Sequence, residues 1–254
     1  MRCISMTLLL LIVAVGGCGR PSAVVQKFYA MPDKVAEEFE VYADTAAKPP
    51  ILHGFYRSYY EDGTRKEFGQ YRDGVRVGEW VSAYADGQVR KRGRYEGGKE
   101  HGLWVSYRRD GQVRWQRSFA HGRKSGPWTY YHANGQRLRT ENYTAGILDG
   151  AFLAYYESGQ IEEQGNFSNG KRDGRRVYYG EDGRIEREES YAVGKKDGSW
   201  VWYDGAGEVR AEGIYSDDAP WHGRFVVPYI NGQPRREESY KGGVKDGRWV
   251  FYAK

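Results

Sequence analysis

The side chains most able to bind a metal or to move a proton are five histidines, and their positions argue against both roles. His53, His101 and His222 each directly precede a glycine that recurs along the chain, and the other two are His121 and His132. That placement favours turn residues over ligands. No cysteine accompanies them, and no pair has the close spacing of a zinc-binding helix. We therefore predict no metal and no cofactor.

Paired carboxylates are the second group with chemical potential. Glu162-Glu163, Glu188-Glu189 and Glu237-Glu238 stand at matching positions of a repeat. Glycoside hydrolysis needs two carboxyl groups in different environments, whereas duplicated pairs are typical of a solvated strand face. The glycine-rich turns lack the Gly-Lys-Ser/Thr ending of a phosphate-binding loop. We predict that the protein is not an enzyme and has no small-molecule substrate.

The charge pattern favours a solvated surface over a basic stripe that binds nucleic acid. The chain has 39 basic and 34 acidic residues, a formal net charge of +5. The two signs alternate, and basic runs are short, as at Arg108-Arg109. Binding to a phosphate backbone needs cations aligned on one face. We predict a mixed-charge solvated surface and no nucleic-acid partner.

The N-terminus has the features of an export signal. Arg2 is followed by an apolar run from Met6 to Val15, and small residues lead to Cys18. The stretch 4–17 is 14 residues long, short of the roughly 20 that a transmembrane helix needs. It is therefore interpreted as a signal peptide rather than an anchor helix.

The sequence Val-Gly-Gly-Cys ending at Cys18 resembles the lipobox of bacterial lipoproteins. The resemblance implies that Cys18 is acylated and that residues 1–17 are absent from the mature protein. Cys3 would leave with the signal. An ordinary signal peptide with a chance cysteine is the alternative. The implied location is the cell envelope, with the protein attached to the membrane by its N-terminal lipid, at the outer membrane if the organism has two membranes.

A glycine recurs every 24 residues along the chain, and this period predicts where the other side chains lie. Gly54, Gly78 and Gly102 begin a series of nine glycines that continues to Gly247 with one interval of 25. Aromatic residues follow these glycines at positions two and seventeen, and we expect them to form the core by stacking between repeats. The predicted core residues are Trp80, Trp104, Trp128, Phe152, Trp200, Phe225 and Trp249, with Tyr71, Tyr95, Phe119, Tyr143, Phe167, Tyr191, Tyr215 and Tyr240.

A second glycine, nine positions after the first, follows Asp or Asn in six of eight complete repeats, as in Asp62-Gly63. Such dipeptides are typical of tight hairpin turns with positive φ. A glycine-rich loop then leads to the next repeat. The predicted fold is all-β: an elongated, twisted antiparallel sheet or meander of about nine tandem hairpins. Because positions two and five differ by an odd number, Trp104 and Tyr107 should lie on opposite faces.

The predicted organisation is a signal peptide (1–17), a lipidated cysteine with linker and capping element (18–50), and a repeat domain (51–254). Residues 32–42 are expected to form a short helix or an added strand. The segment from Gly126 to Gly150, GPWTYYHANGQRLRTENYTAGILDG, resembles the bacterial MORN repeat variant. Many members of that family are labelled YwqK-type antitoxins, and eukaryotic MORN proteins act as scaffolds.

We therefore expect a non-catalytic scaffold that binds another envelope protein. A toxin-neutralising immunity protein and a cell-wall glycan-binding module are the alternatives. Departures from the repeat are the candidate binding residues. Arg176 replaces an aromatic residue at position two, and Trp221 lies in the only insertion of the repeat series.

Overall fold

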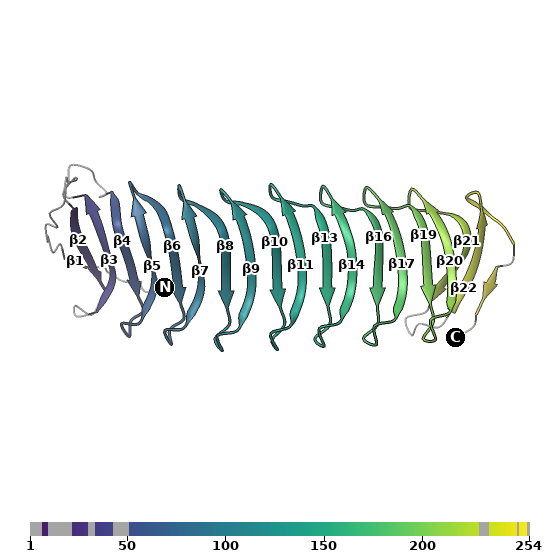
Figure 1. Cartoon of the computed structure of the whole chain (residues 1–254), viewed down its shortest axis with the longest axis horizontal. Helices are drawn as coiled ribbons and strands as arrows, with labels where there is room; N and C mark the ends of the chain where they lie inside the picture. The colour runs from purple at the N-terminus through teal and green to yellow at the C-terminus, as the bar shows by residue number, and fades with distance from the viewer. Residues whose placement is uncertain are drawn as a thin grey trace. The chain divides into compact units, whose positions relative to one another are not determined.

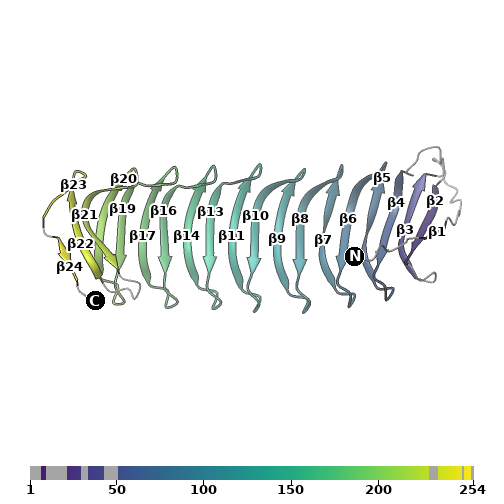
Figure 2. The same ribbon diagram turned by 180° about the vertical axis from the view of Figure 1, so that it is seen from behind.

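The computed structural model describes residues 7–9, 22–29, 34–42, 51–228, 234–247 and 249–252. Cys18 and the expected cleavage region lie outside these residues. The chain forms two compact units, residues 1–126 and 127–254, and each is described by itself. Every element in the described part of both units is a β-strand, and the strand pairs are antiparallel (Figures 1 and 2). The predicted all-β class and the tandem hairpins are therefore confirmed.

Successive strands of the first unit pair in chain order. Its strands are β1 (Thr7–Leu9), β2 (Ser22–Phe28), β3 (Val35–Tyr42), β4 (Leu52–Tyr59), β5 (Arg65–Arg72), β6 (Val75–Ala83), β7 (Val89–Glu96), β8 (Lys99–Tyr107) and β9 (Val113–Ala120), while β10 (Arg123–Tyr131) contains the boundary between the units. β3 pairs with both β2 and β4, so the expected capping element is a strand rather than a helix. Its Phe39 packs in a buried cluster with Val25 and Val41.

The second unit repeats a long strand and an interrupted strand. Its strands are β11 (Arg137–Thr144), β12 (Ile147–Leu148), β13 (Gly150–Tyr155), β14 (Ile161–Ser168), β15 (Lys171–Arg172), β16 (Gly174–Tyr179), β17 (Ile185–Ala192), β18 (Lys195–Lys196), β19 (Gly198–Tyr203), β20 (Val209–Ser216), β21 (Ala219–Pro228), β22 (Pro234–Lys241), β23 (Val244–Lys245) and β24 (Val250–Phe251). β17, for example, pairs first with β18 and then with β19. Each hairpin therefore continues directly into the next.

The Asp/Asn-Gly turns are wider than the dipeptides suggest. The backbone N–H of Gly63 donates to the carbonyl of Tyr60 (2.9 Å), and the N–H of Tyr60 donates to Thr64 (2.8 Å). Only Gly63 of the pair has a positive φ, because the Asp62 carboxylate instead accepts the N–H of Thr64 at 2.8 Å. This is a three-residue loop with a terminal left-handed glycine. The chain thus folds back at this dipeptide as predicted, with the positive φ at the glycine.

The positive-φ pair lies at the other end of the strands, where a glycine-rich loop was expected. The turn between β5 and β6 consists of Asp73 (φ 52°) and Gly74 (φ 79°). Even Val193 adopts this conformation, with φ 52°. A β-branched residue is strained there. The two-residue turn matches the right-handed twist of the flanking strands, which explains why the fold tolerates the cost.

The core of each unit is a ladder of rings. In the first unit Trp80 contacts Tyr71 and Tyr95, with ring centroids 5.2 and 5.9 Å apart, and Tyr95 contacts Trp104 at 5.1 Å. Trp80 is 2% exposed. Burying such a ring contributes on the order of 2–3 kcal/mol. The predicted packing of position-two against position-seventeen aromatics is present.

The ladder of the second unit is longest toward its C-terminal end. There it contains Tyr191, Trp200, Tyr215, Phe225, Tyr240 and Trp249, with successive centroids 5.0–6.0 Å apart. Trp128 with Tyr143, and Phe152 with Phe167, also make ring contacts, with centroids 5.0 and 5.8 Å apart. Phe119 of the first unit is half-buried.

The pairing of β7 with β8 contains a register shift close to the place where the Trp104 indole packs. Between Arg92 and Arg94 of β7 the pairing with β8 slips, next to Gly102, whose φ is 69°. The indole of Trp104 then lies against Gly93. A Cβ added to Gly93 would be 2.0 Å from the indole, so the ring can occupy this place only over a glycine.

Candidate functional site

The ladder side of the sheet, here named the ring face, is covered by cations. It is defined by Trp80 and Trp104 in the first unit and by Trp200 in the second. The guanidinium of Arg76 lies 3.9 Å from the Trp80 centroid, and the Lys91 ammonium lies 4.1 Å from that of Trp104. Such contacts stabilise a ring and shield it from water. These indoles, 2–4% exposed, offer no free face on which a sugar could stack.

Buried ionic groups recur within the ring face of the second unit. Glu189, 6% exposed, accepts hydrogen bonds from Arg187 (2.9 Å) and from the Tyr191 hydroxyl (2.8 Å). Burial, together with the neighbouring Glu189 charge, raises the pKa of Tyr191 to about 12. The set is repeated as Arg139, Glu141 and Tyr143, and as Arg236, Glu238 and Tyr240. A carboxylate held in this way in three repeats is a structural element.

Arg176 is placed inside the ladder. It is 3% exposed, its guanidinium forms an ion pair with Glu163, and it lies 4.9 Å from the Phe152 centroid and 5.3 Å from that of Phe167. Its side chain packs over Gly165, as the Trp104 indole packs over its own glycine. Arg176 therefore substitutes for a core ring and does not present its guanidinium to a partner.

The opposite side, here named the tyrosine face, carries the position-five tyrosines. Tyr107 contacts Arg92, whereas Trp104 contacts the preceding residue, Lys91, so the predicted separation of Trp104 and Tyr107 onto two faces is confirmed. The Tyr179 hydroxyl accepts a 2.7 Å hydrogen bond from Gln164. Tyr179 is thus tied to a polar side chain.

Arg–Glu–Tyr sets recur on the tyrosine face of the second unit. Glu188 accepts hydrogen bonds from Arg175 (3.0 Å) and Tyr203 (3.3 Å), and the Arg175 side chain is 59% exposed. The Arg175 hydrogen bond holds the pKa of Glu188 below its usual value. Arg224, Glu237 and Tyr252 repeat the arrangement at distances of 3.0 and 2.7 Å. These sets present guanidinium and phenol groups at the surface.

Trp221, the second candidate binding residue, lies on β21, which pairs with β20 and β22. Its side chain is next to the turn at Gly243, which donates its N–H to the Trp221 carbonyl at 2.8 Å. The residue is 49% exposed. It is accessible to a partner, and its role as an anchor stays a prediction.

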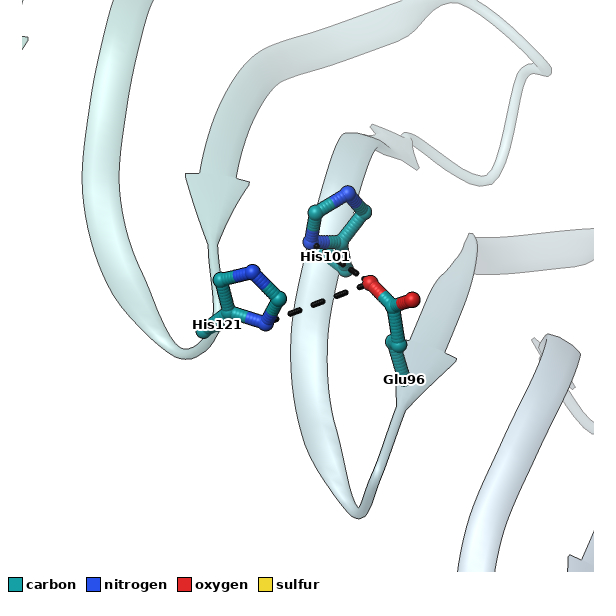
Figure 3. A group of neighbouring side chains, drawn as sticks. All are labelled: Glu96, His101 and His121. Carbon is teal, nitrogen blue, oxygen red and sulfur yellow. Dashed lines mark ion pairs between the residues drawn. The ribbon is translucent and has the colours of Figure 1, made fainter.

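The structure brings together three side chains that the sequence analysis did not connect: Glu96, His101 and His121 (Figure 3). The Glu96 carboxylate lies 3.2 Å from Nδ1 of His101 and 3.9 Å from Nδ1 of His121. They come from the end of β7, from β8 and from the turn after β9. The signal available in the sequence was the presence of histidine at both ends of one repeat.

Comparison with known proteins agrees with the repeat geometry. Residues 124–145 and 148–169 match the family model described as MORN repeat variant. Two segments of the chain are thus similar to the MORN repeat variant. The two matches begin one repeat length apart, in agreement with the 24-residue period. No curated protein matches the chain.

Solved structures that resemble the chain are much larger. They include crystal structures of TcdB2-TccC3-Cdc42 (12% identity, TM-score 0.23) and TcdB2-TccC3-TEV (12%, 0.21), and a Photorhabdus luminescens Tc holotoxin pore (11%, 0.22). The alignments cover 87%, 86% and 89% of this chain but only 14%, 13% and 13% of those chains. Likeness at this level carries no argument about function.

The prediction of membrane attachment is based on the N-terminal sequence alone. Within the described part of the chain, no helix has the length and apolar character needed to cross a bilayer. Cys18, the predicted lipidation site, lies outside the described residues.

Proposed function

We propose that this protein is a non-catalytic protein-binding module, held at the cell envelope by a lipid on Cys18, whose MORN-variant repeats bind another envelope protein. The observation that carries the binding proposal is the difference in side chains between the two faces. The ring face uses its aromatics as core and covers them with cations, whereas the tyrosine face presents Arg and Tyr at the surface.

The chemistry of the tyrosine face suits a protein partner. Arg and Tyr are enriched in the energetically important parts of protein interfaces, because each combines a large contact area with hydrogen bonding. Arg175 and Arg224 have side chains that are 59% and 54% exposed, and each is already oriented by a carboxylate. Such preorganised groups lose little side-chain entropy on binding. Trp221 adds an exposed indole in the same unit.

Photo-cross-linking in intact cells tests the binding proposal. A photoreactive side chain is placed at Arg175 or Arg224 on the tyrosine face, and at Lys245, which is exposed but lies 3.8 Å from the Trp249 ring on the ring face, as the control. We expect one and the same protein adduct from Arg175 and Arg224 and none from Lys245. Absence of any protein adduct from the first two would refute the proposal, and equal adducts from all three would refute the assignment to one face.

Anchoring is tested separately. Metabolic labelling with a radioactive fatty acid should mark the wild-type protein in the membrane fraction. The Cys18→Ser variant should lose the label and move to the soluble fraction. A wild-type protein without label would overturn the lipid anchor and leave the protein-binding test unaffected.

A further inference from the structure

The structure places three potential metal ligands at one edge of the first unit. Glu96 is the last residue of β7, and a two-residue turn separates it from β8, on which His101 lies. His121 is the first residue of the turn that follows β9, with φ 48°. Figure 3 shows the Glu96 carboxylate facing both imidazole rings. Residues 25 positions apart in the sequence thus converge at one point.

The distances are close to those of a metal site. The three nearest ligand atoms lie within 4.8 Å of one another. Around a tetrahedral zinc ion with bonds of about 2.1 Å, neighbouring ligand atoms are roughly 3.4 Å apart. The Glu96–His101 distance of 3.2 Å already meets this geometry. The His121 side chain is 69% exposed, so its ring can rotate toward the other two ligands without disturbing the core.

His101 directly precedes a recurring glycine, and in other repeats the side chain at this position accepts a backbone hydrogen bond. His101 does not make this hydrogen bond. In three other repeats an aspartate at this position accepts a hydrogen bond from the backbone N–H twenty residues later. The donor–acceptor pairs are Asn169–Asp149 (3.2 Å), Val193–Asp173 (3.2 Å) and Asp217–Asp197 (3.4 Å). Nδ1 of His101 is buried and makes no contact with hydrogen-bond geometry, although the Glu96 carboxylate lies 3.2 Å away. An unsatisfied buried nitrogen costs free energy that a ligand would recover.

His53, also in the first unit, shows that a histidine at this position can accept the backbone hydrogen bond. It occupies the same repeat position as His101, but its Nδ1 accepts the N–H of Asp73 at 3.4 Å, and its ring stacks on Tyr42 at 4.2 Å. The local backbone therefore allows a histidine to close the turn in the ordinary way. At His101, Nδ1 instead lies beside a carboxylate and a second imidazole.

We propose that Glu96, His101 and His121 bind a divalent transition-metal ion of the zinc class. Two imidazole nitrogens and one carboxylate oxygen are a ligand set that zinc and its neighbours accept, whereas Ca²⁺ and Mg²⁺ prefer oxygen ligands alone. Three protein ligands leave at least one coordination position for water. The site lies at turns of the first unit and shares no residue with the proposed binding surface of the second unit, so it stands independently of the proposed protein binding.

Zinc titration of the full-length, tag-free protein tests the site. Cys3 and Cys18 are replaced by serine in every sample so that thiols do not contribute. We expect calorimetry to give one Zn²⁺ per chain for this parent protein and no binding of Ca²⁺. Because protons compete for imidazole nitrogens, the affinity should fall at acidic pH.

Each histidine is replaced by the residue that stands at the same position of another repeat. His101→Asp restores the carboxylate of Asp149, and His121→Asn introduces the residue found at the same positive-φ position in Asn169, where φ is 49°. The double variant has no imidazole at the site and should lose at least about tenfold in Zn²⁺ affinity. His53→Asp, the matched control, should bind Zn²⁺ like the parent.

A third substitution covers the case in which the double variant does not fold. Glu96→Gln removes the charged ligand from an exposed strand end and should also weaken Zn²⁺ binding about tenfold or more. In NMR spectra, Zn²⁺ should shift the ring resonances of His101 and His121 but not that of His53. No Zn²⁺ binding by the parent, or equal affinity in parent and variants, would overturn the proposal.

Discussion

The guanidinium carbon of Arg176 lies 4.9 Å from the centroid of the Phe152 ring, at the position where other repeats place an aromatic side chain. The same guanidinium pairs with Glu163. The ladder of the second unit thus continues through a cation and its counter-ion at this repeat. A buried charge pair of this kind gives little net stability, but breaking it is costly because one charge is left without compensation.

Replacement of Arg176 by alanine is expected to lower the free energy of unfolding by about 3–5 kcal/mol, because it leaves the Glu163 carboxylate unpaired and a void over Gly165. Denaturant unfolding measures the change. The adjacent Arg175 is the control: its side chain is 59% exposed, so Arg175→Ala should cost less than about 1 kcal/mol. Equal losses in the two variants would contradict the buried role of Arg176.

A double substitution separates charge from volume at the same place. Arg176→Met with Glu163→Gln removes both charges and keeps most of the side-chain volume. We expect its stability to lie within about 1.5 kcal/mol of the wild type. A loss as large as that of Arg176→Ala would show that packing, rather than the unpaired carboxylate, dominates.

Gly93→Ala tests the close approach of ring and backbone. The added Cβ would lie 2.0 Å from the Trp104 indole, which must then move, and overpacking of this kind costs about 1–3 kcal/mol. The emission spectrum of tryptophan should shift to the red as the indole becomes exposed. Gly205→Ala, where nothing lies within 4 Å of the new Cβ, should change neither quantity.

The buried tyrosines predict a loss of stability at alkaline pH. Burial raises the pKa of Tyr56, Tyr143 and Tyr191 from 10.0 to about 12, the neighbouring carboxylates adding to the effect. The folded state therefore holds these protons more tightly than the unfolded state. The corresponding stability is complete below pH 10 and is lost as the pH rises toward 12.

Chemical denaturation at a series of pH values, with tyrosinate absorbance recorded in parallel, measures this effect. Tyr191→Phe removes one of the three groups and should make the alkaline decline shallower. It should also cost about 1.5–3 kcal/mol at neutral pH, because Glu189 loses a charge-assisted hydrogen bond. Unchanged stability of the wild type up to pH 12 would be inconsistent with the raised pKa values.

Much of the fold followed from spacing. The 24-residue interval between Gly54, Gly78 and Gly102 indicated tandem hairpins, and the rings two and seventeen positions later were correctly predicted to pack on one another. The odd separation of Trp104 and Tyr107 placed them on opposite faces. The turns were less predictable, because Asp62-Gly63 and Asp73-Gly74 have the same dipeptide but different conformations, which depend on the pairing of the flanking strands.

The candidate site was mostly beyond sequence reasoning. Arg176 was noticed as a departure from the repeat, but whether it faced solvent or the core depended on Glu163 and Phe152, which come from two other strands. The histidines were assigned to turns by their positions, and nothing in their spacing showed that a carboxylate of the preceding repeat would lie between two of them.

The period, the strand alternation and the choice of core aromatics are local properties, because they follow from the pleat of a strand and the side chains that it carries. Those the sequence determined by itself. The partners of Arg176, the cations over the indoles and the meeting of Glu96 with His101 and His121 depend on register across neighbouring strands. A shift of one residue would move each side chain to the other face, so only the tertiary structure could decide them.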